Sequence, residues 1–74
     1  MAFDYSKLRG KIVEKFNSQR EFAKALGVSE KTLSNKMNNI IFFRQDDIAQ
    51  ISNILGISTN EINDYFFTEK VKEV

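Results

Sequence analysis

Residues 18–38 read Ser-Gln-Arg-Glu-Phe-Ala-Lys-Ala-Leu-Gly-Val-Ser-Glu-Lys-Thr-Leu-Ser-Asn-Lys-Met-Asn and predict two short helices joined by a tight turn. Ser18 is a favourable N-cap, and Glu21 three positions later completes the pattern of a capping box. Gly27 stands where a left-handed residue ends a helix at least cost. Ser29 can cap the second helix. The capping pattern therefore places both helices and the turn between them.

Apolar residues in this stretch recur at helical spacing, which predicts one buried face for each helix. The predicted inward-facing residues are Phe22, Ala25 and Leu26 in the first helix, Val28 in the turn, and Leu33 and Met37 in the second helix. Ala23 is small enough to let the second helix cross closely. The polar side chains of Glu30, Lys31, Ser34 and Asn35 are left on the outer face, and Lys and Asn can bond to base edges.

The pattern resembles the helix-turn-helix of the phage lambda-type repressor and Cro family, and is most similar to the small phage proteins of that family. The matching residues are Gln19, Glu21, Phe22, Ala23, Leu26, Gly27, Val28, Ser29, Thr32, Leu33 and Asn38. A weaker likeness extends over residues 6–67. Two positions depart from the family: Lys36, where many members carry an apolar residue, and Asn39, where many carry Gly. Asn tolerates the left-handed conformation better than most residues do.

The resemblance implies an all-α, lambda-repressor-like domain of five short helices. The second helix of its helix-turn-helix would enter the major groove of a double-stranded DNA operator. The base-reading residues that it implies are Ser29, Glu30, Lys31, Thr32 and Asn35. The residues expected to hold the DNA backbone flank this helix and are Gln19, Arg20, Lys36, Asn38, Asn39 and Arg44. The first turn of a helix attracts phosphate through its free amides, which supports this role for Gln19.

A symmetric dimer is predicted, because one domain of this size reads too few base pairs to select a genomic site. The expected contact residues are Ile40, Phe42, Tyr65 and Phe67. Residues 40–43 form an apolar run, from which Ile41 and Phe43 are expected to fold inward while the remainder forms a contact surface. The alternative is that all of these side chains are buried within one monomer.

The rest of the chain predicts three further helices. The first begins near Asp4, ends at Asn17, and turns Tyr5, Leu8, Ile12 and Phe16 inward. Its Lys7, Lys11 and Lys15 form either a DNA-facing ridge or, as we favour, a solvated face. The next helix follows Arg44 and turns Ile48, Ile51 and Leu55 inward, with Ala49 and Ile54 beside them. The last begins at a Ser58–Glu61 capping box and ends near Phe67.

Composition limits the function classes. The 74 residues predict a single domain with a core over about 4–67, loosely packed residues 1–3, and a terminal segment 68–74 that is either a tail or a partner-binding strand. The chain has no Cys and no His, so we expect no metal site, no cofactor, no catalytic residue and no small-molecule substrate. No stretch has the length of a membrane span, and we expect a cytoplasmic protein of a bacterial host cell.

Charge is unevenly distributed along the chain. Residues 1–45 hold nine Lys or Arg and four Asp or Glu, a net charge of +5, whereas residues 46–74 hold two and six, a net charge of −4. This asymmetry predicts one face for a polyanion, although ordinary charge scatter is the alternative. We therefore expect a Cro-like, phage- or prophage-encoded transcription regulator. The alternative is a protein-interaction module, such as an antitoxin or anti-repressor, because Glu30 repels phosphate. Salt-dependent binding to duplex DNA separates the two.

Overall fold

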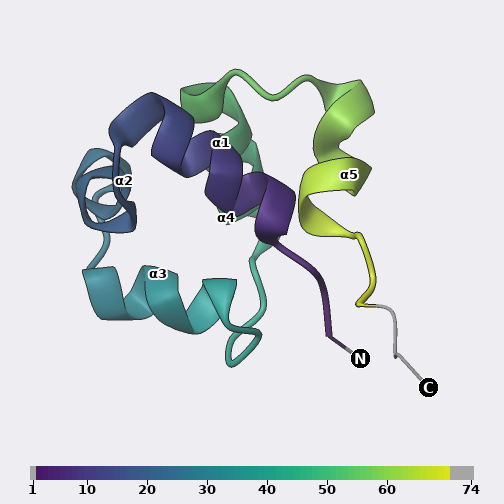
Figure 1. The fold of residues 1–74 in the computed structure, drawn as a ribbon, viewed down its shortest axis with the longest axis horizontal. Coiled ribbons are helices and arrows are strands. Elements are labelled where there is room, and N and C mark those ends of the chain that lie inside the picture. The colour runs from purple at the N-terminus through teal and green to yellow at the C-terminus, as the bar shows by residue number, and fades with distance from the viewer. Residues whose placement is uncertain (1, 71–74) are drawn as a thin grey trace.

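The computed structural model describes residues 2–70, and five α-helices surround one apolar core in this part of the chain (Figure 1). The helices are α1 (Ser6–Phe16), α2 (Gln19–Leu26), α3 (Glu30–Met37), α4 (Gln45–Leu55) and α5 (Ile62–Phe66). A 3-10 turn, Thr59–Glu61, leads into α5. The predicted all-α fold of five short helices is confirmed, and the helix ends lie close to the positions that capping and periodicity predict.

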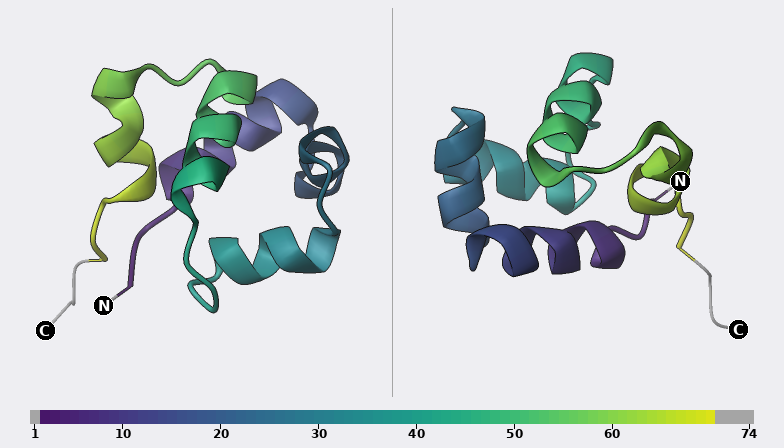
Figure 2. Two further views of the ribbon diagram at one scale, coloured as in Figure 1. Left: turned by 180° about the vertical axis from the view of Figure 1, so that it is seen from behind. Right: turned by 90° about the horizontal axis from the view of Figure 1, so that it is seen from above.

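The helix α1 is the centre of the packing, since it contacts α2, α4 and α5. The helix α2 packs against α3 and α4, and α4 also packs against α5. By contrast, α3 packs mainly against α2 and lies along one edge of the molecule (Figures 1 and 2). This peripheral position leaves one side of α3 without a neighbouring helix.

The core draws side chains from all five helices. Its buried apolar members are Tyr5, Leu8, Ile12, Phe22, Ala23, Leu26, Leu33, Met37, Ile51, Leu55, Ile57, Tyr65 and Phe66. The predicted inward position of Ala25 is wrong, because its side chain is exposed while that of Ala23 is buried. At 3.6 residues per turn, Ala25 lies about 100° from the centre of the stripe that Phe22, Ala23 and Leu26 form. In α4, Ile48 and Ile54 are half-buried and Ala49 is exposed.

Polar residues mark both ends of α1 and the start of the last helical segment. The Asp4 carboxylate accepts a hydrogen bond from the amide of Ser6, the first residue of α1, at 2.9 Å, although Tyr5 and not Asp4 occupies the N-cap position. The bonds from Ser6 hold the pKa of Asp4 below its ordinary value. At the other end, Asn17 adopts a left-handed φ of 69° and ends the helix. The Ser58 amide likewise donates to the Glu61 carboxylate at 3.2 Å before α5.

The two terminal segments pair with each other. Phe3 and Glu69 form an antiparallel bridge, and the Asp4 amide donates to the Thr68 carbonyl at 2.7 Å. The Lys70 amide donates to the Ala2 carbonyl at 3.1 Å. Residues 2–3 and 68–70 are therefore tied to each other, and of the two alternatives for the terminal segment a free tail does not describe residues 68–70. Residue 1 and residues 71–74 lie outside the described residues.

The side chain of Asn39 ties the loop after α3 to this terminal pair. Its amide oxygen accepts from the Phe3 amide and its amide nitrogen donates to the Phe3 carbonyl, both at 2.9 Å. Asn39 itself has a left-handed φ of 63°. This agrees with its place at a position where many members of the resembled family carry Gly, since Asn also tolerates this conformation. These bonds weigh against the expected bond from Asn39 to the DNA backbone, because both polar atoms of the side chain are already bonded within the chain.

Replacing Asn39 with alanine is expected to lower the free energy of unfolding by about 1–3 kcal/mol, because the Phe3 amide and carbonyl lose their partners. Asn39→Gly is the matched control, since glycine accepts the positive φ and loses only the hydrogen bonds. Urea denaturation of the wild type and the two variants separates the contribution of the hydrogen bonds from the strain of alanine at a positive φ. Wild-type stability in both variants would show that the bonds to Phe3 contribute nothing.

Candidate functional site

The helix pair α2–α3 is built by local hydrogen bonds at its turn. The Ser18 hydroxyl accepts from the Glu21 amide at 3.2 Å, and the Ser29 hydroxyl accepts from the Thr32 amide at 3.1 Å. Gly27 ends α2 with a φ of 81°, in the left-handed region. The reciprocal bond, from the Ser18 amide to the Glu21 carboxylate, is not seen; that carboxylate instead lies 3.6 Å from the Lys24 ammonium. The two helices and the tight turn predicted for residues 18–38 are therefore present.

The inner face of α3 is buried and its outer face is open. Leu33 and Met37 are buried as predicted, and Val28 in the turn packs against the core. The five residues predicted to read bases lie on the other side of the helix or at its start. Ser29, Glu30 and Lys31 are exposed, whereas Thr32 and Asn35 are half-buried. The Ser29 hydroxyl also donates to the Thr32 hydroxyl at 2.8 Å, so these two side chains support the start of α3.

The six residues predicted to hold a DNA backbone divide into two groups. Arg20, Asn38 and Arg44 are exposed and Gln19 is half-buried, so these side chains reach solvent beside α3. The other two, Asn39 and Lys36, are held by bonds within the chain. Most of the predicted residues thus reach solvent, whereas the side chains of Lys36 and Asn39 are engaged within the chain.

Lys36 forms an ion pair with Asp47 at 2.6 Å, and the two side chains are only 13% and 19% exposed. The Asp47 carboxylate also accepts from the Arg44 amide at 2.9 Å. Burial alone raises the pKa of Asp47, but the bonds from Lys36 and the Arg44 amide outweigh it and hold the pKa below 3.8. This pair weighs against the expected phosphate contact of Lys36, because its ammonium group joins the last turn of α3 to the first turn of α4.

Asp47 and Phe3 are the two residues with a part in this face that sequence reasoning missed. Asp46 and Asp47 both suit the positive end of α4, and only the tertiary structure shows which of them turns toward α3. The available signal was Lys36 itself, which occupies a position where the resembled family carries an apolar residue. A lysine in a half-buried position requires an acidic partner close to it.

The part of the chain that contributes to this face is nearly balanced in charge. Residues 19–47 hold five Lys or Arg and four Asp or Glu, a net charge of +1. Arg44 is also close to an acid, since its Nε lies 3.6 Å from the Asp46 carboxylate. Four of the nine basic residues of the chain's first part, Lys7, Arg9, Lys11 and Lys15, belong to α1 and not to this face. The predicted concentration of positive charge on one face is therefore much weaker in the structure than in the sequence.

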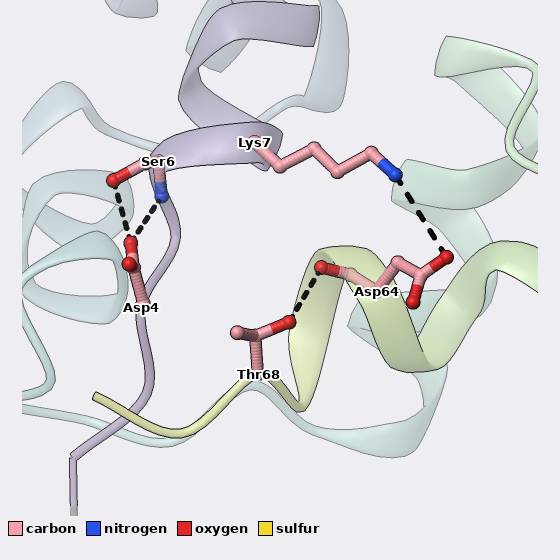
Figure 3. A pocket seen from close by; sticks show the side chains of 5 residues that line it. All are labelled: Asp4, Ser6, Lys7, Asp64 and Thr68. Carbon is pink, nitrogen blue, oxygen red and sulfur yellow. Dashed lines mark hydrogen bonds and ion pairs between the residues drawn. The ribbon is translucent and has the colours of Figure 1, made fainter. Parts of the chain in front are cut away.

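Two of the three aligned lysines of α1 have partners within the chain. Lys7 lies 3.8 Å from the Asp64 carboxylate and 4.9 Å from the centre of the Tyr65 ring, and Lys11 lies 3.8 Å from Glu14. Lys7 and Asp64 border an open recess between the start of α1 and α5, which Asp4, Ser6 and Thr68 complete (Figure 3). These contacts agree with the solvated face that the sequence favoured, and the recess has no residue from α2 or α3.

Two structural features of the described residues bear on other kinds of site. Within residues 2–70, no three side chains of His, Cys, Asp or Glu are grouped so that they could hold a metal ion. None of the described helices has both the length and the apolar character needed to cross a membrane.

The loop between α3 and α4 exposes most of its apolar residues. Ile40, Ile41 and Phe42 are 69%, 46% and 71% exposed. Phe43 alone turns inward, where its ring packs edge-on against those of Tyr5 at 5.2 Å and a phenylalanine of α5 at 5.4 Å. The prediction for Phe43 is confirmed, and that for Ile41 is wrong.

The predicted dimer contact also divides. Ile40 and Phe42 are surface residues, and Phe67 is 47% exposed with its ring edge-on to that of Phe3 at 5.8 Å. Tyr65 is only 6% exposed, because its ring is part of the core. Tyr65 is therefore too buried to take part in a contact between two copies, which corrects that prediction. The side chains of Ile40, Phe42 and Phe67 remain accessible.

Comparisons with known proteins give a family and a solved structure. The model of a family described as "Protein of unknown function (DUF739)" matches residues 1–69. The chain is also similar to the modulator of repression (MOR) of the temperate bacteriophage TP901-1 from Lactococcus lactis, whose structure was determined in solution. The two share 42% sequence identity over 97% of each chain, with a TM-score of 0.83. Comparison with curated protein sequences found no match.

Proposed function

The chain belongs to the DUF739 family, and from this premise we propose that it is a phage-type regulatory protein that modulates repression by binding a repressor. The proposed binding face consists of the outer side of α3 and the loop 40–42 that follows it. The observation that carries the proposal is the Lys36–Asp47 ion pair, which withdraws one cation from this face. A face of mixed charge with exposed apolar residues suits a protein surface better than a polyanion.

Electrostatics supports a protein partner over DNA as the main ligand. Sequence-independent DNA affinity comes mostly from Lys and Arg that neutralise phosphates. On this face Arg20 and Lys31 are exposed cations, but Glu30 lies at the start of the same helix and Asp46 lies beside Arg44. Glu30 lies at the N-terminal end of α3, the end that would enter a DNA groove, where its carboxylate would repel phosphate. The same carboxylate can pair with a basic residue of a protein. The similarity to a protein named as a modulator of repression agrees with this function.

The test is a gel-shift titration with the repressor and operator of the phage or prophage that encodes the chain. Added to a preformed repressor–operator complex, the protein is expected either to release the operator or to change the mobility of the complex. The protein alone is expected to leave the operator unshifted at 150 mM salt. An unchanged repressor–operator complex at saturating protein would contradict the proposed function.

Direct binding to an operator is the second candidate function, and the geometry of α2–α3 favours it. A short helix pair with an open second helix is the arrangement that places a reading helix in the major groove. Lys31 and Asn35 lie on that open side and are of the types that read guanine and adenine. Binding of the protein alone, with an affinity that falls steeply with salt, would select this function. In that case Asn35→Ala would weaken binding to the preferred site more than binding to random duplex.

A further inference from the structure

We infer that the exposed loop residues Ile40, Ile41 and Phe42, here called the apolar patch, are the anchor of the repressor interface and insert into an apolar groove on that protein. The inference rests on the proposed function and adds the residues and the chemistry that determine affinity. Aromatic and aliphatic side chains that enter a pocket on the partner commonly carry most of the energy of an interface. The patch lies directly after α3, so one partner can cover both.

The concentration of exposed apolar side chains in this loop is unusual for the molecule. Among the described residues, the large apolar side chains that remain exposed are Val13, Ile40, Ile41, Phe42 and Phe67, and three of these five are consecutive. Single exposed apolar residues are ordinary, but a contiguous group marks an interaction surface. The loop was also the place where the core had room for only one ring, that of Phe43.

The backbone of the loop holds the apolar patch outward in a fixed arrangement. The amides of Ile40 and Ile41 both donate to the Asn35 carbonyl, at 2.9 and 3.2 Å. Before the patch, Asn39 is bonded twice to Phe3, and after it the Phe43 ring is fixed in the core. Because the loop is held at both ends, binding a partner orders little additional backbone. Such preorganisation lowers the entropic cost of association.

Charge around the apolar patch argues for a protein groove with a polar rim of both signs. The nearest charged residues in sequence after the patch are Arg44 and Asp46, an exposed pair whose Nε and carboxylate oxygen lie 3.6 Å apart. Before the patch, the Lys36 ammonium is neutralised by Asp47. A polyanion would find no surplus of positive charge here. A protein groove, by contrast, can place one acid and one base against the rim pair.

Area argues against a second copy of this chain as the occupant. Three largely exposed side chains offer a few hundred Å². A stable interface needs about 800 Å² from each partner, so a symmetric contact across the apolar patch alone is too small. A repressor that also covers the outer side of α3 reaches the larger area. The proposed occupant is a repressor that contacts the helix and the loop together, and the sedimentation experiment below tests whether a second copy does so instead.

Isothermal titration of the purified repressor with the full chain tests the inference. Phe42→Ser is expected to weaken binding at least tenfold, and Ile40→Ser to weaken it in the same direction. Val13→Ser is the matched control, because it removes an exposed apolar side chain from α1, outside the patch, and is expected to leave affinity unchanged. Thermal unfolding of each variant checks that the fold is kept, as expected for substitutions at exposed positions.

The outcomes are distinguishable. If the wild-type chain does not bind the repressor, the proposed function fails and the inference fails with it. If the wild type binds and Phe42→Ser and Ile40→Ser bind equally well, the inference alone is overturned. Sedimentation of the free chain adds a third arm: a stable dimer that Phe42→Ser dissociates would show that a second copy occupies the apolar patch, which also overturns the inference.

Discussion

Replacing Phe66 with alanine is expected to lower the free energy of unfolding by about 3–5 kcal/mol. Its side chain is 1% exposed in the core, and its ring packs edge-on against Phe43 at 5.4 Å. The substitution removes the ring and leaves a cavity that α5 cannot close. A domain of this length has a total free energy of unfolding of roughly 4–11 kcal/mol, so the substitution is expected to remove a large part of it. Urea denaturation followed by circular dichroism measures the change.

The neighbouring Phe67 provides the matched control for this prediction. Its side chain is 47% exposed at the end of the same helix, with the ring against that of Phe3. Phe67→Ala is therefore expected to cost about 1 kcal/mol or less, since much of the ring is already in water. If the two substitutions had equal effects, the assignment of Phe66 to the core and Phe67 to the surface would be wrong.

Asp47→Ala is the second substitution with a large expected effect, a loss of about 2–3 kcal/mol. It leaves the Lys36 ammonium in a half-buried position without its partner, and it removes the acceptor of the Arg44 amide at the start of α4. The adjacent Asp46 is the control, because its pair with Arg44 is exposed and exposed pairs contribute little. Asp46→Ala is expected to change stability by less than about 0.5 kcal/mol.

The pH dependence of the Asp47 substitution has a definite sign. The pKa of Asp47 in the folded chain lies below 3.8, so its ionised form stabilises the fold at pH values above the unfolded pKa. This stabilisation is lost as the pH falls through the folded pKa. The difference in stability between wild type and Asp47→Ala is therefore expected to be full at pH 7 and to shrink below about pH 3.8. A difference that grows in acid would contradict the ion pair.

The positions of the helices were predictable because local interactions determine them. The Ser29 cap bonds the amide three residues later, and Gly27 ends α2 by its own left-handed backbone. The spacing of Leu33 and Met37 gave the buried face of α3 in the same way. Each of these features depends on residues within one turn of each other. Errors came where a neighbour in sequence had to be chosen, as for Ala25 against Ala23 and Ile41 against Phe43.

The availability of polar side chains on the candidate face was not predictable in this way. Lys36 and Asp47 are 11 residues apart, and Asn39 and Phe3 are 36 apart. Both pairs look like free surface groups in the sequence, since nothing local binds them. The charge asymmetry misled for the same reason. The acidic second half folds back on the basic first half, where Asp47 neutralises Lys36 and Asp64 approaches Lys7.

The sequence by itself determined the five helices, their caps and the open outer side of α3, because backbone hydrogen bonds and apolar periodicity act over three or four residues. Only the tertiary structure decided which side chains that face offers to a partner. Packing brings α4 and the N-terminal segment against the end of α3. There the Lys36 ammonium is bonded to Asp47 and the Asn39 side chain is bonded to Phe3. The Phe43 ring packs against the core while residues 40–42 stay in water, since so short a chain can bury only a modest fraction of its surface.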